Sequence, residues 1–111
     1  MFVFVEVMDG KIIVVSNVHL PSYPYGPEVL HRGATFERVT KLENRLRVSA
    51  LKRQLRVLPG LAKSGIPVFL TGDFNVPSHL DCTKEVSQCF MWPISMKLNR
   101  LGFRDSYREI Y

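Results

Sequence analysis

The sequence predicts one domain of the α+β class, and three observations support this prediction. Two runs of β-branched and aromatic residues lie near the N-terminus, an amphipathic stretch follows them, and a third apolar run comes after that stretch. The chain has 111 residues, of which 46% are hydrophobic and 23% are charged. This length and composition are typical of a single folded domain and exclude a disordered segment.

We expect the first two strands at residues 2–7 (FVFVEV) and 11–18 (KIIVVSNV), because both are rich in residues that favour strands. The short link MDG between them contains glycine and is typical of an antiparallel hairpin. Residues 12–15 are four successive apolar residues. This run indicates a strand that is covered on both faces.

A long loop is predicted from His19 to about Thr40. Its sequence is rich in residues that interrupt regular structure, namely Pro21, Pro24, Gly26, Pro27 and Gly33. Loops of this length inside small domains are usually functional or mobile.

An amphipathic helix is predicted over residues 41–58. Its apolar side repeats at three- and four-residue spacing through Leu42, Leu46, Ala50, Leu51, Leu55 and Leu58. Four basic residues lie off that stripe: Arg45, Lys52, Arg53 and Arg56. We expect Pro59 and Gly60 to disturb the end of the helix and Gly65 to close it, before IPVFL forms a short buried strand.

The order strand, helix, strand implies a right-handed crossover onto the same sheet. The loops that begin at His19 and Gly72 should therefore leave the sheet at the same edge. Beyond them, ISMKLNRLGF predicts a short helix that ends at Gly102, and RDSYREIY predicts a polar terminal segment.

The formal net charge is +5, which favours anionic partners such as phosphate esters or nucleic acid. The basic residues of the helix have a second interpretation, since a charge run on a helix is often only its solvated face. No element that reads bases is evident, so nucleic acid is a partner without support from a motif.

Two cysteines, Cys82 and Cys89, show no zinc-type spacing and no disulfide framework. We expect free thiols in a reducing compartment, which favours a cytoplasmic location. The N-terminal MFVFVEVMDG is too short to span a bilayer and lacks the features of a signal peptide. We therefore expect no membrane span.

Polar side chains gather where two predicted strands end: Asn17 and His19 after one, Asp73 and Asn75 after the other. A carboxylate can orient a water molecule, an amide can donate to a phosphoryl oxygen, and an imidazole can stabilise an anionic transition state. Mg²⁺ would complete such a site, because it prefers carboxylate and amide oxygens. The alternative is structural, since Gly, Asp and Asn are also common turn formers.

The blocks VVSNVHL, PVFLTGDFNVPSHLD and WPISMKLNRLGFRDSYRE occur in this order over nearly the whole chain. Together they resemble the endonuclease/exonuclease/phosphatase family, the metal-dependent phosphoesterases related to deoxyribonuclease I and the neutral sphingomyelinases. The resemblance implies hydrolysis of a phosphate ester by in-line attack of water, normally with Mg²⁺. It also implies a four-layer α/β/β/α sandwich, of which residues 1–111 would form part.

The resemblance also implies roles for particular residues. His19 and Asn75 match positions that contact the scissile phosphate, Asp73 matches the carboxylate that orients water, and Asp105 resembles a further aspartate near the active site. Asn17, Ser78 and His79 are the expected substrate-binding residues. NVPSHLD is similar to a subgroup in which Trp often stands at the position of Cys82, and His79 has the alternative role of stabilising its loop.

The chain departs from the family pattern at both ends. It lacks the strand with the metal-binding glutamate and the terminal Asp-His pair, and Glu6 fits a surface position. We therefore expect the isolated chain to be a weak or inactive enzyme, with a non-catalytic protein that binds phosphate or nucleic acid as the alternative. Half a sandwich also leaves a sheet face uncovered, which favours self-association.

Overall fold

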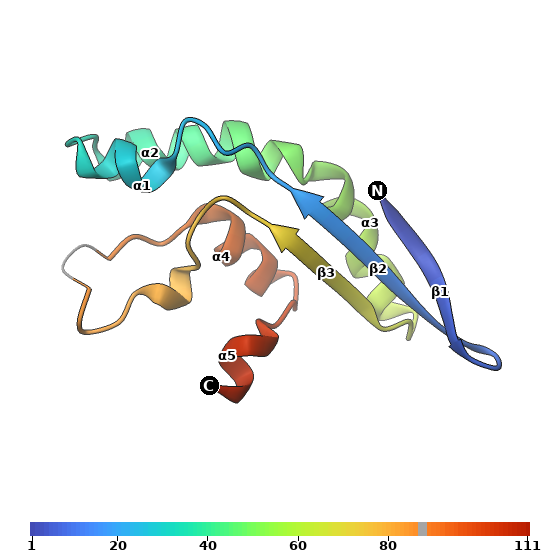
Figure 1. The fold of residues 1–111 in the computed structure, drawn as a ribbon. Coiled ribbons are helices and arrows are strands. Elements are labelled where there is room, and N and C mark those ends of the chain that lie inside the picture. The colour runs from blue at the N-terminus through green and yellow to red at the C-terminus, as the bar shows by residue number, and fades with distance from the viewer. Residues whose placement is uncertain (87–88) are drawn as a thin grey trace.

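The computed structural model describes residues 1–86 and 89–111 and contains a three-stranded sheet in the order β1-β2-β3 (Figure 1). Strand β1 (Phe2–Met8) runs antiparallel to β2 (Lys11–His19), and β2 runs parallel to β3 (Val68–Asp73). The predicted hairpin and crossover are therefore confirmed. So is the α+β class in its coarse form, since the described residues combine this sheet with helices.

The helices lie in two groups, one between β2 and β3 and one after β3. Between β2 and β3 lie α1 (Gly26–His31), α2 (Phe36–Glu43), a π-helical turn (Asn44–Val48) and α3 (Lys52–Lys63). After β3 come a 3₁₀ turn (His79–Asp81), α4 (Pro93–Arg100) and α5 (Ser106–Ile110). The predicted short helix before Gly102 is α4, whereas the terminal segment also contains the helix α5.

The prediction of a loop from His19 to Thr40 is wrong for residues 26–31 and 36–40, which lie in α1 and α2. Pro27 lies in the first turn of α1, where the missing N–H of proline costs no hydrogen bond. Thr35 caps α2, because its hydroxyl oxygen accepts a hydrogen bond from the Arg38 backbone N–H at 3.2 Å. Of the residues that suggested a loop, Gly26 and Pro27 begin α1, and Gly33 lies in the short link between α1 and α2.

The predicted helix over residues 41–58 is longer than expected, running from α2 through α3 and past Pro59 to Lys63. Gly65 follows it with a φ of 94°, as expected for a closing residue. Its buried positions are 39, 43, 47, 51, 54 and 58. The three successive intervals of four residues from 39 to 51 exceed the ordinary 3.6 residues per turn, and the wider π-helical turn accommodates this spacing.

A buried ion pair fixes this helix to the chain before α1. Arg47 Nη1 donates to Glu43 Oε1 at 2.5 Å, and both side chains are fully buried. Arg47 Nη2 also donates to the carbonyl of Pro24 at 2.9 Å. Gly26 packs so closely that a Cβ there would lie 2.3 Å from Glu43 Oε1, so only glycine fits. Burial raises the pKa of Glu43, while the charge of Arg47 opposes that rise.

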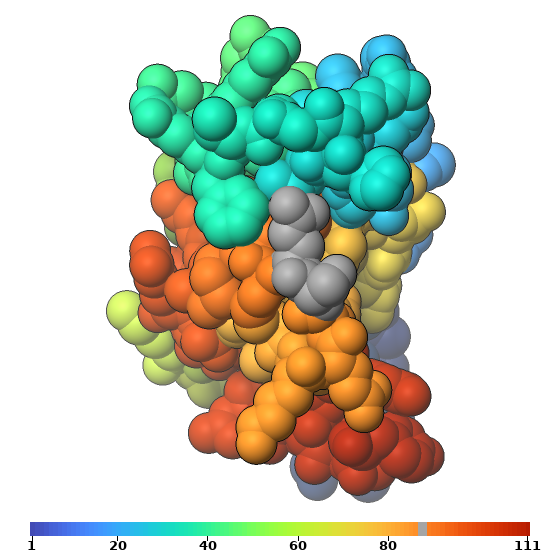
Figure 2. Space-filling model, turned by 90° about the vertical axis from the view of Figure 1, so that its left-hand side faces the viewer, coloured from blue at the N-terminus to red at the C-terminus, as the bar shows by residue number. Residues whose placement is uncertain are grey.

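Two apolar clusters hold the helices to the sheet and to each other. Val18, Leu20, Leu51 and Ile94 join the sheet to α4 and the long helix. A second cluster consists of Leu30, Val39, Phe90 and Trp92, in which the last two rings pack edge to face at 4.6 Å. Figure 2 shows this end of the molecule, with α1 and α2 in teal and green above the orange segment that precedes α4 and the red C-terminus below.

The two faces of the sheet differ in their cover. Val14, Ser16 and Val18 are buried beneath the helices. On the other face, which we call the open face, the register aligns Val3, Val15 and Phe69, and Val3 and Phe69 are each 52% exposed. The expectations that β2 is covered on both faces and that residues 66–70 form a buried strand are therefore wrong for the described residues. The second sheet of a sandwich stays a prediction.

Candidate functional site

The parallel pairing of β2 and β3 brings two predicted site residues together. His19 is the register partner of Asp73 at the carboxyl ends of the two strands, as the crossover predicted. One residue earlier, Gly72 pairs with Val18 and has a φ of 129°. A Cβ at Gly72 would lie 1.9 Å from the Val18 carbonyl oxygen, so only glycine allows this approach.

Asn17 lies on the open face, two residues before His19 and two after Val15. Thr71, its register partner on β3, donates its hydroxyl proton to Asn17 Oδ1 at 3.1 Å. This bond fixes the amide orientation and leaves the N–H protons of Asn17 as donors. Sequence reasoning missed Thr71, whose signal is its place two residues before Asp73.

Asn75 forms a turn that orients Asp73. Its backbone N–H donates to Asp73 Oδ1 at 2.9 Å, and its own φ is 51°, in the left-handed region that Asn tolerates. Its side-chain Nδ2 donates to the carbonyl of Leu20 at 2.8 Å, which ties the loop to the end of β2. The turn-forming role is thus present in the structure, and a phosphate contact by Asn75 stays a prediction.

Ser78 and His79 hold the following loop in shape. The Ser78 hydroxyl accepts from the Leu80 N–H, and Asp81 Oδ2 accepts from the Ser78 N–H at 2.8 Å, which completes a capping box. His79 contacts Ser95 of α4 twice, through its backbone N–H at 2.8 Å and its Nδ1 at 2.9 Å. These contacts fit the loop-stabilising alternative, and substrate binding by either residue stays a prediction.

Asp105 caps α5, because its Oδ1 accepts from the N–H groups of Tyr107 and Arg108 at 3.1 and 3.2 Å. It borders a hollow of about 320 Å³ between β3, α4 and the start of α5. Thr71 and His79 also line this hollow, whereas His19 and Asp73 lie outside its lining. The structure therefore groups Asp105 with His79, apart from the His19 and Asp73 pair.

The described residues do not provide enough ligands to hold a magnesium ion by themselves. Within residues 1–86 and 89–111, no group of three His, Cys, Asp or Glu side chains lies close enough to hold a metal. Glu6 accepts from the Gly10 N–H at 2.9 Å in the hairpin turn. Its register partner Ile12 precedes His19 by seven residues, which places Glu6 roughly 23 Å along the sheet from the site.

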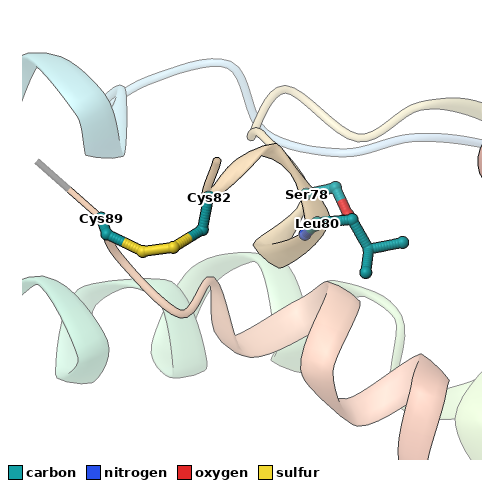
Figure 3. Close-up of a disulfide and its surroundings, with 4 residues drawn as sticks. All are labelled: Ser78, Leu80, Cys82 and Cys89. Atoms are coloured by element: carbon teal, nitrogen blue, oxygen red, sulfur yellow. Dashed lines mark hydrogen bonds between the residues drawn. A yellow bond between two sulfur atoms is a disulfide. The ribbon is translucent and has the colours of Figure 1, made fainter. Parts of the chain in front are cut away.

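The two cysteines form a disulfide, and the expectation of free thiols is wrong (Figure 3). Their Cα atoms lie 5.0 Å apart. Cys82 directly follows the 3₁₀ turn, and Cys89 precedes the buried Phe90, so both ends of the intervening loop are held by packed neighbours. A spacing of six intervening residues gives no recognisable motif, which is why the sequence did not reveal the bridge.

A search for helices that could cross a membrane found none that is long and apolar enough in the described part of the chain.

The comparisons with known proteins leave the family open. No protein-family model matches the chain, and no solved structure matches it. An uncharacterized protein of Caenorhabditis elegans is 31% identical to this chain over an alignment of 117 positions, gaps included. The alignment covers 92% of this chain and 36% of that protein. The chain thus spans about a third of the length of this curated relative.

Proposed function

We propose that this chain carries the phosphate-contacting part of a metal-dependent phosphate-ester hydrolase. The observation that supports the proposal is the register pairing of His19 with Asp73 at the exposed carboxyl end of two parallel strands. Ligands commonly bind outside the carboxyl ends of parallel strands, where loops present polar groups from a rigid base. The resemblance of the three sequence blocks to the endonuclease/exonuclease/phosphatase family points to the same chemistry.

In the proposed reaction, each side chain has a separate task. The His19 imidazole donates to a phosphoryl oxygen and stabilises the charge that develops there, with Asn17 as a second donor. The Asp73 carboxylate accepts a proton from the attacking water and aims it in line with the leaving group. The backbone N–H of Asn75 binds one carboxylate oxygen at 2.9 Å, which leaves the other oxygen to accept the proton of the water.

Binding without efficient turnover is the behaviour we propose for the chain alone. Phosphoesterases of this type normally use Mg²⁺, and Glu6 is held in the hairpin turn, far from His19. Among the described residues, Asp73 is then the carboxylate available beside His19, and a single carboxylate binds Mg²⁺ weakly. The same observation favours the second candidate function, a non-catalytic protein that binds phosphate esters or nucleic acid.

Self-association through the open face is part of this proposal. Val3, Val5 and Phe69 present apolar side chains there, and β1 is an edge strand that can pair with another chain. Contiguous exposed apolar surface of this kind marks contact sites. A second copy of the chain would cover this surface.

Titration with bis(4-nitrophenyl) phosphate tests the site. Backbone amide signals at the carboxyl ends of β2 and β3, which are present in every variant, are followed by nuclear magnetic resonance, and nitrophenol release with Mg²⁺ is followed in parallel. We expect saturable binding that weakens at least tenfold in His19→Ala and in Asn17→Ala, because each variant loses a donor to the phosphoryl oxygens. His31→Ala is the matched control, since His31 is an exposed histidine on α1.

Two results decide against the proposal in different ways. Equal binding by the wild-type chain, His19→Ala and His31→Ala would show that this end of the sheet is not a phosphate site. Mg²⁺-dependent nitrophenol release that disappears in both His19→Ala and Asp73→Asn would show that the chain is a complete enzyme, contrary to the proposed lack of turnover.

A further inference from the structure

The positive charge of the protein is concentrated on one layer. Residues 36–63, which form α2, the π-helical turn and α3, hold eight of the 15 Lys and Arg residues and two of the ten acidic residues. This stretch therefore has a net charge of +6, and the remainder of the chain has a net charge of −1. The excess of positive charge in the chain therefore lies on the long helix.

Both acidic residues of the helix are already paired within it. Glu37 binds Lys41 at 2.7 Å on the surface, and Glu43 binds the buried Arg47. The six other basic residues are all exposed, and we call them the basic ridge: Arg38, Arg45, Lys52, Arg53, Arg56 and Lys63. No ion pair involving these six occurs within the described residues.

The basic ridge follows one side of the helix. Five of its positions, 38, 45, 52, 56 and 63, are separated by seven, seven, four and seven residues, which are close to whole numbers of helical turns. Arg53 lies beside this line, one residue after Lys52. The buried positions lie on the other side, against the sheet and α4. At 1.5 Å per residue, the 25 steps from Arg38 to Lys63 extend about 38 Å.

The basic ridge and the candidate phosphate site lie on opposite sides of the molecule. The helix layer covers the face of the sheet that contains Val14 and Val18 (Figure 1), whereas Asn17 projects from the open face. A ligand on the ridge therefore leaves the site free. The inference that follows does not depend on the proposed hydrolase function.

We propose that the basic ridge binds the phosphate backbone of double-stranded DNA without reading its sequence. Four of the six side chains are arginines, whose planar guanidinium groups bind phosphate oxygens in pairs. The length of the ridge, about 38 Å, is close to one turn of B-form DNA at roughly 34–36 Å. A single helix 10–12 Å wide also matches a major groove of about 12 Å.

The composition of the ridge argues against other polyanions. Residues 37–63 contain no aromatic side chain, and Phe36 at the start of α2 packs edge to face against Phe90 at 5.2 Å, so the ridge offers single strands no platform on which bases can stack. The exposed positions between the basic residues include Ser49 and Gly60, which offer nothing to insert into a bilayer. Duplex RNA has a deep and narrow major groove that does not admit a helix.

Fluorescence anisotropy with a labelled 30-base-pair DNA duplex, measured between 50 and 200 mM NaCl, tests the proposal. Six phosphate contacts predict that the logarithm of the binding constant falls with the logarithm of salt with a slope of about −5. The triple variant Arg45→Gln, Arg53→Gln, Arg56→Gln should bind at least tenfold more weakly, with a slope near −3. All three positions are exposed, so circular dichroism should show an unchanged fold.

The matched control is the triple variant Lys11→Gln, Lys84→Gln, Arg100→Gln. It removes the same charge from exposed positions outside the helix, and its slope should equal that of the wild-type chain. His19→Ala should also bind DNA normally, which separates this surface from the proposed phosphate site. Equal weakening in both triple variants would show a general charge effect and overturn the proposal. Tighter ridge-dependent binding to phosphatidylserine vesicles or to duplex RNA would overturn it as well.

Discussion

The two faces of the sheet carry similar residues but meet different surroundings. Val14 and Val15 are neighbours in β2, yet Val14 is fully buried beneath the helices and Val15 belongs to the open face with the exposed Phe69. The covered face joins the first apolar cluster through Val18, and the helices beyond it contain a fully buried ion pair and a second apolar cluster. The difference teaches that the covered face determines stability, while the open face is available for binding and association.

The largest expected effect comes from the ion pair beside the covered face. Arg47→Ala leaves the Glu43 carboxylate buried without its partner and frees the carbonyl of Pro24, so the free energy of unfolding should fall by about 3–5 kcal/mol. Urea denaturation measures the loss. The double variant Glu43→Leu, Arg47→Met is the control, and it should lose much less because no unpaired charge remains.

The same pair gives a pH dependence with a definite sign. The pKa of Glu43 is raised in the folded protein, so the folded state binds its proton more tightly than the unfolded state does. Its contribution to stability is therefore present below the ordinary glutamate pKa of about 4.3 and is lost as pH rises through the raised value. Arg47→Ala removes the charge that opposes the rise in the Glu43 pKa. In this variant the free energy of unfolding should therefore fall more between pH 4 and 7 than it does in the wild-type chain. A constant difference from the wild-type chain across that range would contradict the assignment.

A pair of truncations compares the two faces directly. Leu51→Ala removes a fully buried side chain from the first apolar cluster and should cost about 2–5 kcal/mol in the free energy of unfolding. Phe69→Ser, on the open face, should change stability by no more than about 0.5 kcal/mol. Analytical ultracentrifugation should instead show weaker self-association for Phe69→Ser. A monodisperse wild-type monomer would exclude association through the open face.

The most local of the expected losses concerns Asp105. Asp105→Ala removes the cap of α5 and should lower its stability by about 1 kcal/mol, measured by amide hydrogen exchange of Tyr107 and Arg108. Asp105→Asn should restore the cap, because an amide oxygen also accepts from N–H groups. Loss of phosphate-ester binding in Asp105→Asn, with α5 intact, would instead support the site role that the sequence predicted.

The sequence predicted the parts of the fold that depend on local patterns. Runs of β-branched residues marked β1 and β2, and the intervening helix required the crossover that pairs His19 with Asp73. Proline and glycine were less informative, because each has two uses. Pro27 begins a helix, and Pro59 lies inside one.

The sequence could not predict features that depend on contacts between residues distant in the chain. Glu43 and Arg47 count as polar in any apolar pattern, and only the approach of Pro24 and Gly26 makes their burial favourable. The hydroxyl of Ser95, contributed by α4, fixes His79, and the disulfide joins loop ends that packing brings together. The sequence therefore located His19 and Asp73 but not the contacts that give Asn75, His79 and Asp105 structural tasks.

The close approach at Gly72 has a genetic consequence. Every missense change at codon 72 introduces at least a Cβ, and that atom would collide with the carbonyl of Val18 in the neighbouring strand. The damage would reach both halves of the candidate site at once, although they lie more than fifty positions apart in the chain. In a library of all single substitutions, position 72 should therefore tolerate no replacement, whereas Gly60, with open space around it, should accept many.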